Sequence, residues 1–252
     1  LLNRLVFKLY NIDAHIYINM NKMKYTILGE RCSGTKFLQN LVSVNFEVDI
    51  QWEGIGWKHF FNFDGYESRI KSNSQLLYIG IVRNPIDYLI SFYNNPHHQS
   101  VDRTVDMRTF LLGEFYSIWR NPDIEIMEDR RIDGVRYSNI FEMRSCKCKF
   151  LLDRMVDIAD KYEMVRYEDL KNDPRQFLES IESKYKLRRR NDDFIINSSR
   201  IDSCTDINEC GQPSYSTSTI QLRENYDVKG DVMDIIMSHI DKDTENRMSY
   251  LL

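Results

Sequence analysis

The sequence predicts an α/β domain in which helices cover both faces of a central parallel sheet. Two observations support this class: apolar segments of strand length alternate with amphipathic segments of helix length, and a glycine-containing turn joins the first such pair. Strands that alternate with helices form parallel sheets, because each helix returns the chain across one face of the sheet. The chain has 252 residues, which is enough for one domain of this class with a large core.

The first strand is expected at residues 24–28 (KYTIL), and it ends at Gly29. The following segment, SGTKFLQNLVSV, has apolar residues at helical spacing, with Ser33 or Gly34 near the start of the helix. A helix N-terminus presents backbone N–H groups to an anion, and the helix dipole adds to the attraction. The loop is therefore a candidate phosphate site. The alternative is an ordinary turn between a strand and a helix.

The loop differs from a Walker A loop in the order of its last residues. In a Walker A loop, Lys follows the last glycine directly and a hydroxyl residue then binds magnesium. Here Thr35 follows Gly34, and Lys36 comes one place later. One position rotates a side chain by ~100° about the helix axis, so Lys36 would point away from the position of a β- or γ-phosphate. This order disfavours magnesium-dependent nucleotide hydrolysis.

The second strand is expected at residues 76–82 (LLYIGIV), a continuous apolar run typical of a strand that is buried on both faces. The strand ends at Arg83, and Asn84 and Pro85 then suit a helix cap and a first helical residue. Arg83 therefore stands at the carboxyl edge of the sheet, where open α/β folds bind their ligands.

Arg83 is a second candidate anion site. Its planar guanidinium can hold a phosphate with two hydrogen bonds. Ser91 follows about two helical turns later, so its hydroxyl could donate to the same group. The alternative is that Arg83 pairs with an acid such as Asp87 and that Ser91 only packs. Two phosphate sites at neighbouring strand ends suit a nucleotide that carries phosphates at two separate places.

The rest of the chain continues the alternation of strands and helices. A third strand is expected at residues 162–167 (YEMVRY), and a helix is expected from Asp173-Pro174 to about residue 184. The other expected elements are a helix at residues 105–120, a polar loop at 120–134, a helix within 138–159, a loop or flap at 197–221 and a final helix at about 229–248.

Three separated segments resemble the sulfotransferases that use 3′-phosphoadenosine 5′-phosphosulfate (PAPS). LGERCSGTKFL resembles the family's 5′-phosphosulfate loop, RNPIDYLISFY its 3′-phosphate motif, and MVRYEDLKNDPRQFLESI its YED-containing strand and following helix. The spacing from Arg83 to Ser91 matches the family's Arg-to-Ser spacing, and the three segments stand in the family's order. The resemblance implies an α/β, three-layer, P-loop-like fold with a central parallel sheet flanked by helices.

The same resemblance implies how the cosubstrate PAPS would be bound. Arg83 and Ser91 would hold its 3′-phosphate, and Tyr167 would lie near the base. Phe37 would contact the adenine. The loop residues that would contact the 5′-phosphosulfate are Arg31, Cys32, Ser33, Gly34, Thr35 and Lys36. Core packing is the alternative for the aromatic residues.

The loop departs from the family pattern at one position. Many members have Lys or Arg two places before the loop glycine, where this chain has Cys32. The cation that assists the leaving phosphosulfate must then come from Arg31, from Lys36 or from another segment. Lys36 could take an equivalent position from one turn away.

Sulfuryl transfer requires a base for the acceptor proton and cations for the charge on the moving group. The segment GIGWKHFFNF, residues 54–63, has Lys58 and His59 between the two nucleotide motifs. Imidazole has an unperturbed pKa near ~6.5 and suits a base at neutral pH. We therefore assign His59 as the base, and Lys58 and Lys36 as stabilising cations. The resemblance implies Glu30 as a rival base, because some carbohydrate sulfotransferases use a glutamate. The alternative for His59 is a packed or surface histidine without a chemical role.

The segment MRSCKCK, residues 143–149, is expected to be a solvated helix face. The resemblance to sulfotransferases nevertheless leaves room for Arg144 or Lys147 near the site.

Composition limits the partners of the chain. A net charge of −4 argues against a general nucleic-acid binder. Five cysteines, an odd number, indicate reduced thiols and hence a cytoplasmic location, and no spacing of Cys and His indicates a metal site. No apolar run approaches the ~18 residues of a membrane span, and the first residues make a poor signal peptide.

The sequence therefore predicts a PAPS-dependent sulfotransferase that acts, without a metal, on a hydroxyl or amine of a carbohydrate or small molecule. Residues 20–252 would form a single domain, and residues 1–19 an accessory extension. Two alternatives remain: a nucleotide-dependent phosphotransferase or kinase on the same scaffold, and a nucleotide-binding protein without enzymatic activity.

Overall fold

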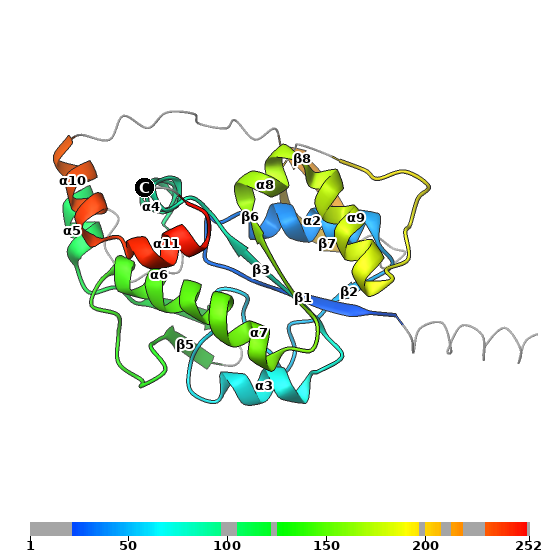
Figure 1. The fold of residues 1–252 in the computed structure, drawn as a ribbon, viewed down its shortest axis with the longest axis horizontal. Coiled ribbons are helices and arrows are strands. Elements are labelled where there is room, and N and C mark those ends of the chain that lie inside the picture. The colour runs from blue at the N-terminus through cyan, green and yellow to red at the C-terminus, as the bar shows by residue number, and fades with distance from the viewer. Residues whose placement is uncertain are drawn as a thin grey trace, which may run out of the picture.

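The chain folds around a four-stranded parallel sheet. A computed structural model describes residues 22–96, 105–121, 125–196, 200–207, 213–218 and 230–250. The strand order is β2-β1-β3-β6, and each neighbouring pair is parallel (Figure 1). The strands are β1 (Lys24–Leu28), β2 (Asp49–Ile50), β3 (Leu77–Val82) and β6 (Tyr162–Arg166). The carboxyl ends of β1, β3 and β6 therefore lie along one edge of the sheet.

β3 contributes side chains to both faces of the sheet. All of its residues are buried, and successive residues of a strand point to opposite faces. Leu77, Ile79 and Ile81 belong to one hydrophobic cluster, whereas Tyr78 and Val82 belong to a second. The continuous apolar run in the sequence thus reflects burial on both sides, as expected for a central parallel strand.

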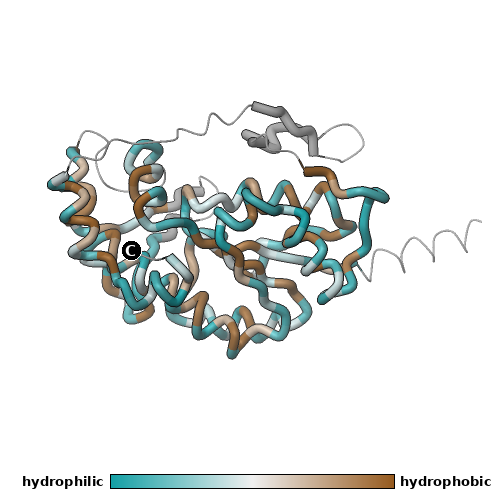
Figure 2. The backbone as a smooth tube through the Cα atoms, turned by 45° about the horizontal axis from the view of Figure 1, so that its top comes forward, coloured by the Kyte–Doolittle hydropathy of each residue, from teal (hydrophilic) through white to brown (hydrophobic). Residues whose placement is uncertain are grey.

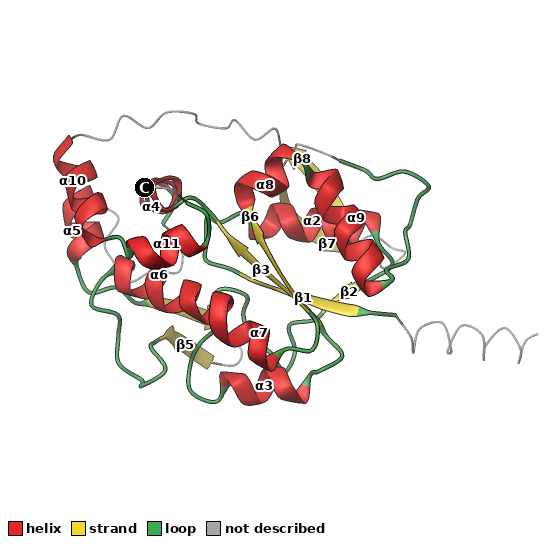
Figure 3. Ribbon diagram, viewed as in Figure 1, coloured by secondary structure: helices red, strands yellow, loops and turns green. Residues whose placement is uncertain are grey.

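Helices cover both faces of the sheet, so the domain has three layers (Figures 1 and 3). The first cluster is covered by α2 (Thr35–Asn45), α8 (Tyr167–Asn172) and α9 (Pro174–Tyr185). The second is covered by α3 (Tyr66–Ser72), the π-helical turn η1 (Phe150–Arg154) and α7 (Met155–Ile158). Figure 2 shows hydrophobic and hydrophilic segments alternating along the helices, as expected for helices with one buried face. The predicted α/β class, with a central parallel sheet flanked by helices, is confirmed.

A third hydrophobic cluster joins helices from the middle and the end of the chain. These helices are α4 (Pro85–Asn94), α5 (Met107–Leu112), α6 (Ile140–Lys149) and α10 (Gly230–His239). The last helix, α11 (Lys242–Arg247), lies against α6 (Figure 1). In the part of the chain that the structure describes, no helix has both the length and the apolar character needed to span a bilayer.

Most of the elements expected from the sequence are confirmed. The expected strands at residues 24–28, 76–82 and 162–167 correspond to β1, β3 and β6, with ends that differ by at most one residue. The expected helices after Gly34, from Pro85 and from Pro174 correspond to α2, α4 and α9. The helix expected within residues 138–159 is the continuous run of α6, η1 and α7.

The helix expected at residues 105–120 and the polar loop expected at 120–134 are each confirmed only in part. α5 ends at Leu112, because Gly113 leaves the helix with an extended backbone. The chain then forms β4 (Ser117–Asn121), which pairs with β5 (Glu125–Asp129) in an antiparallel ladder. β-branched and aromatic residues follow the helix end and favour a strand there, and β5 lies where a polar loop was expected.

Two later predictions also need correction. The final helix expected at residues 229–248 is divided into α10 and α11, because the side chain of Asp241 accepts a hydrogen bond from the Thr244 N–H and starts a new helix. The described residues within the expected loop at 197–221 form an antiparallel pair, β7 (Arg200–Ile207) and β8 (Pro213–Ser218). Polar strands rich in Ser and Thr lack the apolar alternation that identifies a strand from sequence. The extension expected at residues 1–19 lies outside the described residues.

Candidate functional site

The loop between β1 and α2 presents a helix N-terminus at the carboxyl edge of the sheet. It begins at Gly29, where a Cβ atom would lie 2.6 Å from Cγ2 of Ile81 on β3. It ends at Gly34, which precedes α2 with φ of +91° and offers no side-chain cap. The first turn of α2 therefore directs N–H groups outward without a capping side chain from residue 34. This is the arrangement that binds anions at helix N-termini.

Arg83 and Tyr167 reach this loop from the ends of β3 and β6. The Nη1 atom of Arg83 donates to the carbonyl of Cys32 at 2.9 Å. The Arg83 guanidinium also lies 5.0 Å from the ring centroid of Tyr167, and the Tyr167 ring covers Gly34. The glycine loop and the Arg83 segment therefore adjoin and make up a single candidate site.

Arg83 retains an unused donor at this site. Its Nε atom is buried and has no hydrogen-bond partner among the described residues. Ser91 lies nearby on α4, because the thiol of Cys32 donates to the Ser91 carbonyl at 3.7 Å. The structure thus brings Cys32, Arg83 and Ser91 together.

The other candidate loop residues differ in exposure. Ser33 and Thr35 are buried, and Lys36 is exposed. Phe37 is half-buried in the first hydrophobic cluster and packs edge to face against Tyr167, with ring centroids 6.3 Å apart. Because both rings are only partly buried, Phe37 and Tyr167 can pack against the core and still offer a surface to an adenine ring.

Cys32 and Arg31 stand next to each other in the middle of the glycine loop. Cys32 has φ of +63°, and burial raises the pKa of its thiol, so it is a neutral group at pH 7. Arg31 is 0% exposed, with its guanidinium 4.6 Å from the Phe92 ring centroid and 3.4 Å from a carboxylate oxygen of Glu30. The charge of Arg31 is therefore directed into the protein, and Lys36 is the cation that this loop presents to solvent.

Lys58 lies close enough to Lys36 for the two charges to interact. Burial, and then the nearby positive charge of Lys36, lower the pKa of Lys58 to about 8. The Lys58 ammonium is also 5.9 Å from the ring centroid of Trp52. The two ammonium groups repel each other near the N-terminus of α2. An anion bound between them would reduce this repulsion and would itself be stabilised.

His59 is held against the start of the glycine loop. Its ring is 4% exposed, and Nδ1 donates to the carbonyl of Gly29 at 2.6 Å. The Gly29 N–H in turn donates to the carbonyl of Lys58 at 3.1 Å. Because a carbonyl can only accept, neutral His59 carries its proton on Nδ1 and its lone pair on Nε2. The ring of Trp57 lies edge-on, with its centroid 4.6 Å from that of His59.

The expectation that residues 143–149 form a solvated helix face was wrong, because four of these residues are buried: Met143, Arg144, Lys147 and Cys148. Arg144 is 4% exposed and makes two hydrogen bonds to Glu245 of α11, at 2.5 and 2.8 Å. It also donates to the carbonyl of Arg83 at 2.8 Å. Arg144 therefore links the end of the chain to the strand end that carries Arg83.

Lys147, one turn further along α6, is 1% exposed. Its ammonium donates to Glu30, to Asp129 and to the carbonyl of His59. Burial alone would raise the pKa of Glu30, but Lys147 and Arg31 hold that pKa below its ordinary value. Glu30 thus lies in a buried ion pair. The sequence around Arg144 and Lys147 holds no signal for this buried side of α6, because the partners Glu245 and Glu30 are far away along the chain.

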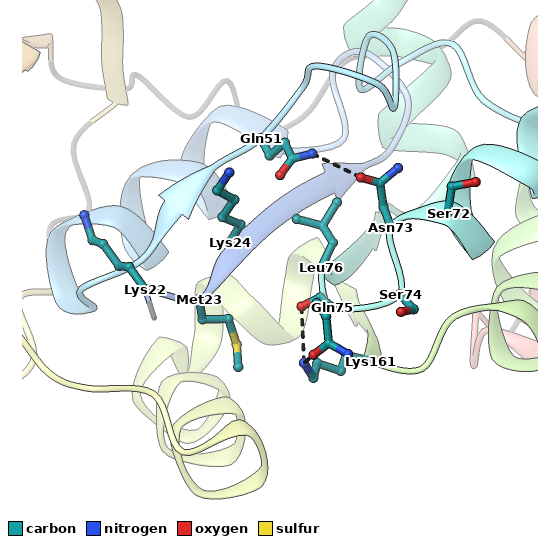
Figure 4. Close-up of a pocket in the computed structure, with 10 residues that line it drawn as sticks. All are labelled: Lys22, Met23, Lys24, Gln51, Ser72, Asn73, Ser74, Gln75, Leu76 and Lys161. Atoms are coloured by element: carbon teal, nitrogen blue, oxygen red, sulfur yellow. Dashed lines mark hydrogen bonds between the residues drawn. The ribbon is translucent and has the colours of Figure 1, made fainter. Parts of the chain in front are cut away.

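A pocket of about 490 Å³ lies at the opposite edge of the sheet, where β1 and β3 begin (Figure 4). Two pairs of its lining residues bond to each other: Lys161 donates to Gln75, and Gln51 donates to Asn73. None of the predicted site residues lines this pocket. Within the described residues, no group of three or more His, Cys, Asp and Glu side chains is arranged to hold a metal ion.

No protein-family model and no curated protein matches this chain.

Proposed function

We propose that the chain is a PAPS-dependent sulfotransferase that moves a sulfuryl group to a hydroxyl or amine of an acceptor. One observation carries the proposal: Arg83, at the carboxyl end of β3, bonds to the carbonyl of Cys32 in the glycine loop and stacks on Tyr167. An anion site at a helix N-terminus and an arginine site at the next strand end thus adjoin. This combination suits a nucleotide with phosphates at two separate positions.

The residues around Arg83 fit the 3′-phosphate end of such a nucleotide. The buried Nε atom of Arg83 has no partner in the described part of the chain and could donate to a phosphate oxygen. Ser91 lies next to Cys32 and could add a hydroxyl donor. The half-buried ring of Tyr167, with Phe37 beside it, offers an apolar surface for the base.

The residues around Lys36 fit the phosphosulfate end. PAPS supplies an activated sulfuryl group whose bond to the 5′-phosphate breaks as the acceptor oxygen or nitrogen bonds to sulfur. Lys36 and Lys58 would balance the charge that develops on the bridging oxygen and on the sulfuryl oxygens. The N–H groups of the first turn of α2 would hold the 5′-phosphate.

His59 would take the proton that the acceptor loses. Its Nδ1 proton is committed to the Gly29 carbonyl, so the proton would be received at Nε2. Burial of the ring excludes bulk water, which protects the sulfuryl group from hydrolysis. Glu30, the rival base, has its oxygens in contact with Lys147 and Arg31 instead.

A phosphotransferase on the same scaffold is the second candidate, because a strand, a glycine loop and a helix also bind nucleoside triphosphates. The Gly34-Thr35-Lys36 order disfavours it. A nucleotide-binding protein without activity is the third candidate, since Cys32 replaces a common cation of the family.

Ligand-induced thermal stabilisation separates these candidates. We expect stabilisation by 3′-phosphoadenosine 5′-phosphate in the absence of magnesium, and none by ATP with magnesium. The reverse preference would contradict the proposal. Transfer of labelled sulfate from PAPS to a panel of acceptors would then separate an enzyme from a binding protein. His59→Ala should abolish that transfer while preserving nucleotide binding.

A further inference from the structure

The ammonium group of Lys147 meets three acceptors from three separate segments of the chain. Its Nζ atom lies 2.6 Å from Glu30 Oε1 in the glycine loop, 2.7 Å from the His59 carbonyl and 2.5 Å from Asp129 Oδ2 on β5. A lysine ammonium has three N–H donors, so these bonds use its whole capacity. The position of the group is therefore fixed by all three segments at once.

Two of these segments are the ones that hold His59. The loop begins with Gly29, which accepts from Nδ1 of His59 and donates to the Lys58 carbonyl. Lys147 connects the next loop residue, Glu30, to the backbone of His59 itself. Gly29 therefore fixes the imidazole ring, and Lys147 fixes the backbone that carries the ring.

We propose that Lys147 is a positioning residue. It holds the His59 ring at a fixed position relative to the glycine loop, so that Nδ1 keeps its proton and Nε2 carries the lone pair. The inference rests on the proposed function only in giving that lone pair a chemical use. Lys147 does not reach the surface and does not contact the reacting atoms, because its bonds are all internal.

The surroundings of Lys147 explain why another residue would not serve. Its ammonium lies 5.0 Å from the ring centroid of Phe61, and it lies between the carboxylates of Glu30 and Asp129. Burial, reinforced by the negative charge of Glu30, raises the pKa of Asp129 to about 6 despite the bond from Lys147. Methionine at position 147 would leave two carboxylates together in a buried site, and arginine would bring a larger planar group into a space filled by an ammonium.

The same helix contains a control for a purely structural role. Arg144 is also buried and also pairs with an acid, Glu245, but it contacts the carbonyl of Arg83 and not that of His59. Removal of the Arg144 pair should therefore loosen the fold without altering the state of the His59 ring.

The test is nitrogen NMR of the imidazole of His59 in the full chain without nucleotide, with His59→Gln used to assign the signals. The wild-type ring should be almost entirely in the form protonated at Nδ1. Lys147→Met alone leaves buried carboxylates and could fail to fold, so the informative variant is K147M/E30Q/D129N, in which the three groups are neutral. In this variant we expect the ratio of Nε2–H to Nδ1–H forms to rise by about tenfold, the change expected from the loss of one charge-assisted hydrogen bond.

Two outcomes would overturn the inference. One is a folded K147M/E30Q/D129N variant with the wild-type ratio of tautomers. The other is an equal change of the ratio in the control R144M/E245Q, which would indicate general loosening. The proposed function is tested separately by nucleotide binding. If the tautomer ratio changes as expected but 3′-phosphoadenosine 5′-phosphate does not bind, Lys147 still positions His59 and only the assignment as a sulfotransferase fails.

Discussion

Gly34 lies beneath the ring of Tyr167, so closely that a Cβ atom on residue 34 would be 2.3 Å from Cδ2 of that ring. Its φ of +91° is also in the left-handed region that residues other than glycine rarely adopt. Both the ring contact and the backbone conformation therefore require glycine at this position. The contact joins the start of α2 to the end of β6.

Gly34→Ala should destabilise the fold by more than about 2 kcal/mol, because backbone strain of ~1 kcal/mol adds to the overlap with Tyr167. Gly65→Ala is the matched control, since Gly65 also precedes a helix with positive φ but a Cβ there would meet nothing within 4 Å. It should cost only about 1 kcal/mol. Urea denaturation measures both values. Equal losses would show that the Tyr167 contact adds nothing.

Arg83→Lys should weaken binding of 3′-phosphoadenosine 5′-phosphate by about 10- to 100-fold, because an ammonium cannot bond to the Cys32 carbonyl and to a phosphate as a planar fork does. Arg69→Lys is the control, since Arg69 stacks on Phe63 at the same 5.0 Å distance on α3. Calorimetry should give wild-type affinity for the control. Adenosine 5′-phosphate, which lacks the 3′-phosphate, should bind R83K and the wild type alike; a loss there would contradict the assignment of Arg83 to the 3′-phosphate.

Nucleotide affinity should fall as pH rises through about 8. Burial and Lys36 lower the pKa of Lys58 to about 8, so Lys58 is charged below this pH and neutral above it. An anion binds the charged form, and the loss approaches tenfold for each pH unit above the pKa. Lys58→Arg stays charged, so its affinity should not fall over this range. A fall of the same size in K58R would exclude Lys58 as the source. The measurement is a binding titration at pH 6.5 to 9.5, the range about the value near 8.

Glu245→Gln should cost about 3 to 5 kcal/mol, because it leaves the buried Arg144 without a counter-charge. The exposed pair of Arg154 and Glu67 has the same two-bond geometry, and Glu67→Gln should cost less than about 1 kcal/mol. Denaturant unfolding compares the two. If both substitutions cost the same, burial does not distinguish the pairs and the role given to Arg144 is wrong.

The central fold could be predicted because its signals are local. β3 is a continuous apolar run that ends at Arg83, and Asn84 and Pro85 then start α4 as cap and first residue. Both features depend on residues that are neighbours in sequence. The break at Asp241 is local as well, but it lies inside an amphipathic pattern that continues on both sides, so one helix was expected where two form.

The buried side of α6 could not be predicted, because its charges are compensated from a distance. Arg144 and Lys147 lie in a segment rich in charge, which usually faces solvent. Their partners Glu245 and Glu30 stand 101 and 117 residues away, and no property of residues 143–149 identifies them. The burial of Arg31 depends in the same way on a distant residue. Its guanidinium packs on the ring of Phe92 in α4, and this contact exists only in the folded chain.

The pairing of Arg144 with Glu245 has a consequence for synthesis of the protein. A ribosome adds about 5–20 residues each second, so the 101 residues between these two partners take roughly 5–20 s to follow. Throughout that interval the guanidinium of Arg144 has no Glu245 carboxylate to pair with. The strand end that carries Arg83 also lacks the support of α11. The contacts that run from Glu245 through Arg144 to the strand end of Arg83 can therefore form only after α11 has been synthesised.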